Sequence, residues 1–128
     1  MENVLKQMNF AFFGTGKHKI MPEKFLENEG AIFLDVRAHE EVETLRFDFK
    51  HYGIQTIHIP LDEFPERIDE LPKDKLIGTF CSSGTRSAMA YIFLFSKGFE
   101  NVKWIDAGNE QIVALLKPGN IYKKVQSK

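Results

Sequence analysis

Residues Lys75–Gly98, KLIGTF-CSSGTRS-AMAYIFLFSKG, combine a short apolar segment, a polar loop and a long apolar segment. The first segment, 75–80, is typical of a buried strand. Helical spacing predicts a helix over 87–97, which ends at Gly98 because glycine is favoured just after a helix. This helix is apolar nearly all round, so we expect it to be buried at the centre of the domain.

The same alternation continues along the rest of the chain. Proline has no N–H group, so Pro65 is expected in the first turn of its helix. Short strands interleaved with helices predict an α/β domain of three layers, with a mainly parallel central sheet and helices on both faces. The other expected strands are 31–36, 56–59 and 102–105, and the other expected helices are 22–27, 39–47, 61–71 and 109–116.

A chain of 128 residues fits one domain. We expect residues 22–118 to form that domain and residues 1–21 to be an N-terminal extension packed on it. Residues 119–128 are expected to be a basic C-terminal tail, frayed from Ile121 onward.

Composition excludes several classes of protein. Hydrophobic residues make up 43% of the chain and charged residues 27%, which predicts a packed core. The chain has seventeen basic and eighteen acidic residues, so it lacks the long-range positive electrostatic field expected of a nucleic-acid binder. The longest nearly pure apolar run, 88–95, is far shorter than the roughly 20 residues that span a bilayer. With no export signal at the N-terminus, we expect a cytoplasmic protein without nucleic-acid or membrane partners.

Metal and cofactor sites are not expected. Cys81 is the only cysteine, which rules out an internal disulfide and any zinc site that needs two thiolates. The histidines form no HExxH and no His-x-His pair, and we interpret them as surface or hydrogen-bonded residues. They are His18, His39, His51 and His58.

The loop 81–87 carries the candidate chemistry. It follows a predicted strand, and parallel α/β sheets bind ligands at the carboxyl ends of their strands. Gly84 allows successive N–H groups to converge, and the start of the next helix adds free donors, so the loop suits negative charge. Arg86 adds a cation at the rim. Hydroxyl donors are available from Ser82, Ser83, Thr85 and Ser87.

A cysteine at the start of such a loop should be acidic. Lowering its pKa from about 8.5 to about 6.5 needs about 2.7 kcal/mol of thiolate stabilisation. One or two charge-assisted hydrogen bonds of roughly 1.5–3 kcal/mol each supply that. Cys81 is therefore predicted to be a nucleophile that needs no histidine base.

The loop resembles the active-site loop of the rhodanese family, whose single-domain members are sulfurtransferases. The resemblance covers about residues 22–118. Beyond the loop, the matching segments are Leu34-Asp-Val-Arg37, Ile59-Pro-Leu61, Leu71-Pro-Lys-Asp-Lys75 and Gly98-Phe99 followed by Val102. The sequence departs from the family pattern at His51-Tyr-Gly-Ile-Gln-Thr56, at Ala107-Gly108 and at Ile112, which predicts altered access for the acceptor.

The resemblance implies a persulfide mechanism. Cys81 takes a sulfane sulfur from a donor such as thiosulfate and passes it to cyanide or a thiol. Backbone amides of 82–86 would hold the terminal sulfur, and Arg86 would orient an anionic donor.

Supporting roles are expected around this loop. We expect Asp35 to accept hydrogen bonds from loop backbone and Arg37 to pair with a carboxylate, so both would be structural. Asp106 and Asn109 are candidates for the rim of the crevice. The remaining candidates are Glu40, Glu41 and Glu43 as a solvated helix face, and Phe47 and Phe49 as an apolar acceptor surface or dimer contact.

Two other functions stay open. One is a persulfide carrier that serves a protein partner, either as a monomer or as a homodimer. The other is a cysteine-dependent phosphatase or arsenate reductase. Related phosphatases place five residues between cysteine and arginine, whereas this loop has four, Ser82–Thr85, which disfavours that chemistry.

Overall fold

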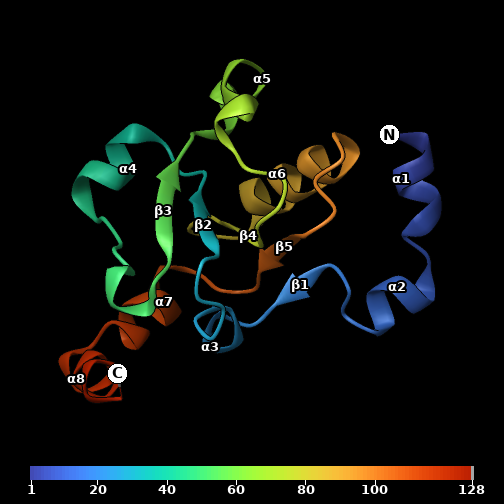
Figure 1. Ribbon diagram of the computed structural model, residues 1–128. Coiled ribbons are helices and arrows are strands. Elements are labelled where there is room, and N and C mark those ends of the chain that lie inside the picture. The colour runs from blue at the N-terminus through green and yellow to red at the C-terminus, as the bar shows by residue number, and fades with distance from the viewer. Residues whose placement is uncertain (128) are drawn as a thin grey trace.

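The computed structural model describes residues 1–127, and its centre is a parallel five-stranded sheet of order β1-β5-β4-β2-β3 (Figure 1). The strands are β1 (Lys19–Ile20), β2 (Ile32–Asp35), β3 (Gln55–His58), β4 (Ile77–Phe80) and β5 (Val102–Ile105). The predicted α/β class with a parallel sheet is confirmed. β1 was not predicted, since two residues are too few to show an alternating pattern.

The predicted helices 22–27, 39–47, 87–97 and 109–116 have counterparts in the structure, whereas the α-helices over residues 2–7, 10–14 and 118–126 were not predicted. The structure also differs from the prediction between residues 61 and 71. There the single predicted helix is wrong, because the chain forms three separate short turns. Pro65 lies in the first turn of α5 (Phe64–Arg67), as expected, and it has no N–H group to bond to the Leu61 carbonyl, which disfavours one α-helix through both residues. The helical elements are α1 (Glu2–Gln7), α2 (Phe10–Gly14), α3 (Pro22–Phe25), α4 (His39–Thr44), η1 (Lys50–Tyr52), η2 (Leu61–Glu63), α5 (Phe64–Arg67), η3 (Ile68–Glu70), α6 (Thr85–Ser96), α7 (Asn109–Leu115) and α8 (Pro118–Gln126).

The sheet separates two hydrophobic clusters. Successive side chains of a strand point to opposite faces, so Leu34 of β2 packs in the cluster that contains Leu94 of α6. Phe33 packs in the cluster that contains Phe25 of α3 and Ile112 of α7. Both β2 and β4 are buried along their whole length, as expected of a parallel sheet covered on both faces.

Helix α6 lies against β4 and β5, but the prediction that it is buried all round is wrong. Its buried residues are Ser87, Ala90, Tyr91 and Leu94, whereas Met89 is 57% exposed. The helix lies on the surface of the sheet and α1 contacts only part of its outer side, so an apolar residue remains in solvent.

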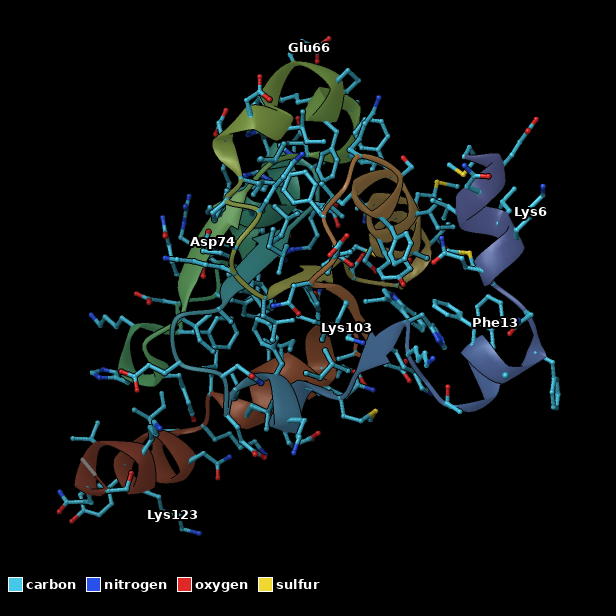
Figure 2. All side chains as sticks on the ribbon, turned by 45° about the vertical axis from the view of Figure 1, so that its right-hand side comes forward. Lys6, Phe13, Glu66, Asp74, Lys103 and Lys123 are labelled. Atoms are coloured by element: carbon cyan, nitrogen blue, oxygen red, sulfur yellow. The ribbon has the colours of Figure 1, made fainter. Side chains whose placement is uncertain are left out.

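The two ends of the chain lie on opposite sides of the molecule. Figures 1 and 2 show α1 and α2, which carry Lys6 and Phe13, on one side and α8 with Lys123 on the other. β1 extends the sheet next to β5, and Met8 and Phe12 pack against the cluster that contains α6.

The prediction of a frayed end from Ile121 is wrong for residues 121–126, which belong to α8, and residue 128 lies outside the described residues. Pro118 is in its first turn and Lys123 and Lys124 are in its last, which is the distribution that helix ends favour. The Lys124 Nζ atom lies 5.7 Å from the centroid of the Tyr52 ring.

Candidate active site

Cys81 lies at the carboxyl end of β4, and its side chain is fully buried beneath the loop that leads into α6. Its Sγ atom accepts the backbone N–H of Gly84 at 3.0 Å and that of Ser87 at 3.3 Å. Gly84 has φ +94°, a conformation that other residues rarely adopt, and it turns the chain so that both N–H groups point at one sulfur. Two converging amide N–H groups suit a sulfur that carries negative charge.

The Ser87 hydroxyl is the third polar group at the sulfur. Its Oγ atom is 3.4 Å from Cys81 Sγ and 3.0 Å from the Gly84 carbonyl oxygen. The indole N–H of Trp104 donates to the same Oγ at 2.8 Å. Ser83 and Thr85 are exposed, so of the predicted hydroxyl donors Ser87 is the one buried against the sulfur.

Opposing influences act on the pKa of the Cys81 thiol. Burial is the largest single influence and raises the pKa, because it disfavours the charged thiolate. Hydrogen bonds from the Ser87 hydroxyl and from the N–H groups of Ser87, Ser83 and Gly84 lower it. Together they outweigh burial and hold the pKa below its ordinary value. The thiolate is therefore more populated near neutral pH than in a free cysteine.

Arg86 is already paired with a carboxylate. Its Nη1 and Nη2 atoms donate to Oε1 and Oε2 of Glu41 at 2.5 Å and 3.0 Å. Nη2 also donates to Ser82 Oγ at 3.1 Å. The interpretation of Glu41 as part of a solvated face was wrong. Sequence reasoning missed it because 45 residues separate the two partners and no local pattern links them.

Glu41 has two tasks at the start of α4. Its Oε1 atom accepts the backbone N–H of Ala38 at 3.0 Å, which caps the helix. The hydrogen bonds from Arg86 are the main reason that the pKa of Glu41 falls to about 2. The carboxylate therefore stays ionised at neutral pH and offsets the charge of the guanidinium.

Asp35 and Arg37 form a buried ion pair, 2% and 1% exposed. Arg37 Nη2 donates to Asp35 Oδ2 at 2.7 Å, and the Arg37 backbone N–H donates to Oδ1 at 3.1 Å. The guanidinium also donates to the Leu45 carbonyl at 2.8 Å and lies over the Phe47 ring, 4.8 Å from its centroid. The pair thus links the end of β2 to the segment after α4.

The expectation that Phe47 and Phe49 form an acceptor surface or dimer contact was wrong. Both rings are buried, 3% and 1% exposed, in the cluster around Phe33. Phe33 is buried on the face of the sheet that α6 leaves free, and these two rings cover it.

An open depression of about 580 Å³ lies beside the cysteine loop, lined by 82–84, Trp104 and 106–111. Asp106 and Asn109 are among its lining residues, as expected for the crevice rim. A Cβ atom added at Gly108 would lie 2.9 Å from the Ser82 carbonyl oxygen. Glycine at this position of the divergent Ala107-Gly108 pair therefore lets the two loops approach closely.

Within residues 1–127, no three His, Cys, Asp or Glu side chains gather closely enough to bind one metal ion. In the same part of the chain, no helix is both long enough and apolar enough to cross a membrane.

Comparison with known proteins adds a family match over most of the chain. The model of the family described as Rhodanese-like domain matches residues 22–115. The crystal structure of a rhodanese-related protein from Thermoplasma volcanium is similar, with a TM-score of 0.65 and 28% identity. The similarity covers 79% of this chain and 95% of that one.

Curated relatives have several names. The tRNA sulfurtransferase of Psychromonas ingrahamii is 34% identical over 80 residues, 62% of this chain and 16% of that protein. The tRNA uridine(34) hydroxylase of Erwinia tasmaniensis is 35% identical over 89 residues, 65% of this chain and 24% of that protein. The putative sulfurtransferase YtwF of Bacillus subtilis is 33% identical over 82 residues, 64% of this chain and 74% of that protein. The match thus spans a quarter or less of the first two relatives and about three quarters of YtwF.

Proposed function

The chain belongs to the rhodanese-like domain family, and on that premise we propose that it transfers sulfane sulfur through a persulfide on Cys81. The observation that supports this most strongly is the pair of N–H groups, from Gly84 and Ser87, that point at the Cys81 sulfur. They stabilise a thiolate without a basic side chain, and a thiolate is the form of cysteine that attacks another sulfur.

The reaction has two steps. The Cys81 thiolate attacks the outer sulfur of a donor such as thiosulfate, a new S–S bond forms, and sulfite leaves with the electron pair of the broken bond. An acceptor thiolate or cyanide then attacks the terminal sulfur, and the Cys81 thiolate leaves with the electron pair. Between the steps the terminal sulfur carries the charge, and we assign its stabilisation to the N–H groups of 82–86, in the loop before α6 and its first turn.

A second candidate function, a carrier that takes sulfur from another protein's persulfide, is favoured by the charges around the loop. Arg86, which sequence reasoning assigned to an anionic donor, is engaged by Glu41. Glu110 lines the adjacent depression, and so does Asp106, whose carboxylate pairs with Lys19 at 3.4 Å. Thiosulfate carries two negative charges and a persulfide only one, so a loop whose cation is already neutralised disfavours thiosulfate relative to a persulfide on another protein.

Intact-mass measurement of the reduced protein tests both functions. The protein is mixed separately with thiosulfate and with a persulfidated thiol, and the rate of a gain of about 32 Da, one sulfur atom, is followed. A sulfurtransferase gains this mass from at least one donor and loses it on addition of cyanide or a thiol. A carrier gains it much faster from the persulfide.

The control is Cys81→Ser, which should gain no sulfur because a serine hydroxyl is not ionised at neutral pH. Sulfur bound to this variant would refute the persulfide on Cys81. Release of phosphate from an aryl phosphate, with no sulfur loading from either donor, would instead establish phosphatase chemistry.

A further inference from the structure

We propose that Trp104 is a positioning residue for the chemistry of Cys81, holding the Ser87 hydroxyl so that it donates to the sulfur when the sulfur is an anion. The importance of Trp104 for sulfur transfer rests on the proposed function. It starts from the three polar contacts of one buried oxygen, Ser87 Oγ.

The hydrogen-bond capacity of Ser87 restricts what its neighbours can do. A hydroxyl has one hydrogen to donate and two lone pairs to accept with. The Trp104 indole N–H can only donate, so it occupies one lone pair of Oγ, at 2.8 Å. The Gly84 carbonyl can only accept, so it needs the Ser87 hydrogen, at 3.0 Å.

The ionisation state of the sulfur decides where the hydroxyl hydrogen points. When Cys81 is a thiol, its S–H donates to the second lone pair of Oγ, at 3.4 Å, and Ser87 donates to Gly84. When Cys81 loses its proton, the same arrangement would point a lone pair of Ser87 Oγ at the negatively charged sulfur. The hydroxyl then turns its hydrogen to the sulfur, and the bond to Trp104 persists through the change.

Once the Ser87 hydroxyl donates to the thiolate, its oxygen accepts a hydrogen bond only from the Trp104 indole. Without that N–H, the oxygen would have no donor. Ser87 is buried, 1% exposed, so bulk water does not replace the lost partner. An unsatisfied buried acceptor is costly, and the anionic state of the sulfur is the state that would bear this cost. Trp104 therefore acts on the Cys81 sulfur through Ser87, which accepts its indole N–H.

The N-terminal segment holds Trp104 in place. The Trp104 backbone N–H donates to the carbonyl of His18, the residue just before β1, at 2.8 Å, and β1 pairs with β5. The His18 ring is stacked on the indole with an interplanar angle of 15°. An apolar cavity of about 240 Å³, lined by Met8, Phe13, His18, Ala88, Tyr91, Ile92 and Trp104, lies on the same side. Residues 1–21 lie outside the family match, so this support is additional to the matched region.

The experiment replaces the indole N–H and nothing else. Trp104 is the only tryptophan in the chain, so biosynthetic incorporation of 3-benzothienylalanine changes this position alone. The analogue keeps the ring shape and puts sulfur where the N–H was. The readout is the alkylation rate of Cys81 by iodoacetamide, which needs no sulfur donor and so does not depend on the success of the transfer assay.

We expect the analogue to alkylate about three- to tenfold more slowly than the natural protein below the titration midpoint, and its pH profile to move to higher pH. That factor corresponds to the loss of one hydrogen bond. The charged groups that act around the loop, Arg86 with Glu41 and Asp35, are unchanged by the replacement. Tyr91→Phe, which removes a hydroxyl from the same apolar cavity, is the matched control and should leave the rate unchanged.

A double substitution distinguishes positioning from packing. In a Ser87→Ala background, the analogue should change the rate less than twofold, because the oxygen it acts through is gone. An equal loss in both backgrounds, or no loss in the natural protein, would overturn the proposal. Sulfur loading that fails while the alkylation effect is present would count against the proposed function alone.

Discussion

Glu41 and Arg86 form a two-point ion pair, at 2.5 Å and 3.0 Å, that joins α4 to the first turn of α6. Arg86 is the cation of the cysteine loop, so this pair decides how much positive charge an incoming donor meets. Planar, two-point pairing of guanidinium and carboxylate is among the stronger polar contacts in proteins. It therefore has consequences for both substrate choice and stability.

Replacing Glu41 with glutamine should improve the use of thiosulfate. Glutamine keeps the oxygen that caps α4 but removes the charge that neutralises Arg86. We expect kcat/KM for thiosulfate to rise about three- to tenfold, and that for a persulfidated thiol to change less than twofold.

Glu43→Gln is the matched control for that experiment, since Glu43 is an exposed residue of the same helix. This substitution should leave kcat/KM unchanged for both donors. If Glu41→Gln changed kcat/KM for the two donors by the same factor, the ion pair would have no part in the choice between them.

The same pair should contribute stability only above acidic pH. The pKa of Glu41 is about 2 in the folded protein and about 4.5 without its partners. A carboxyl group with a lowered folded pKa stabilises the fold above the unfolded value, and this contribution is lost as the pH falls toward the folded value.

Urea unfolding of the natural protein and Glu41→Gln measures this dependence. The natural protein should be the more stable at pH 6, and the difference should shrink as the pH is lowered from about 4.5 toward 2. A difference that is constant from pH 6 to pH 3 would show that charge is not its source.

Gly84→Ala should damage both the fold and the cysteine. Gly84 has φ +94°, so an alanine there is strained and should cost about 1 kcal/mol or more. Relief of that strain moves the Gly84 N–H away from the sulfur, so Cys81 alkylation below the titration midpoint should slow about tenfold.

Gly30→Ala is a stringent control, because Gly30 has φ +89° and open space where a Cβ would be. It should lower the thermal unfolding midpoint similarly and leave Cys81 reactivity unchanged. Loss of reactivity in both variants would mean that the effect comes from general destabilisation.

Local patterns in the sequence predicted most of the scaffold. Four strands and the helix after Cys81 could be predicted because each is a run of apolar residues with one period, and Gly98 marks the end of that helix. β1 could not, since its pairing with β5 comes from tertiary contacts of a two-residue segment. Met89 of α6 looked buried because the pattern does not reveal that α1 covers that helix only in part.

The candidate site was predictable where its members are neighbours in sequence. The loop from Cys81 to Ser87 holds its own N–H donors, so composition and spacing pointed to it. Glu41 and Trp104 reach the loop from distant elements. Only the strand order and the position of α4 bring them to the loop, and neither can be predicted from the local sequence around these residues.

The pH dependence of Cys81 alkylation tests the central claim most directly. The account holds that N–H groups of the loop and the Ser87 hydroxyl lower the pKa of this thiol despite its burial. It predicts a titration midpoint clearly below the ordinary thiol value of about 8.5 in the natural protein. A midpoint at or above about 8.5 would contradict it, because burial would then outweigh the hydrogen bonds that the cysteine loop provides.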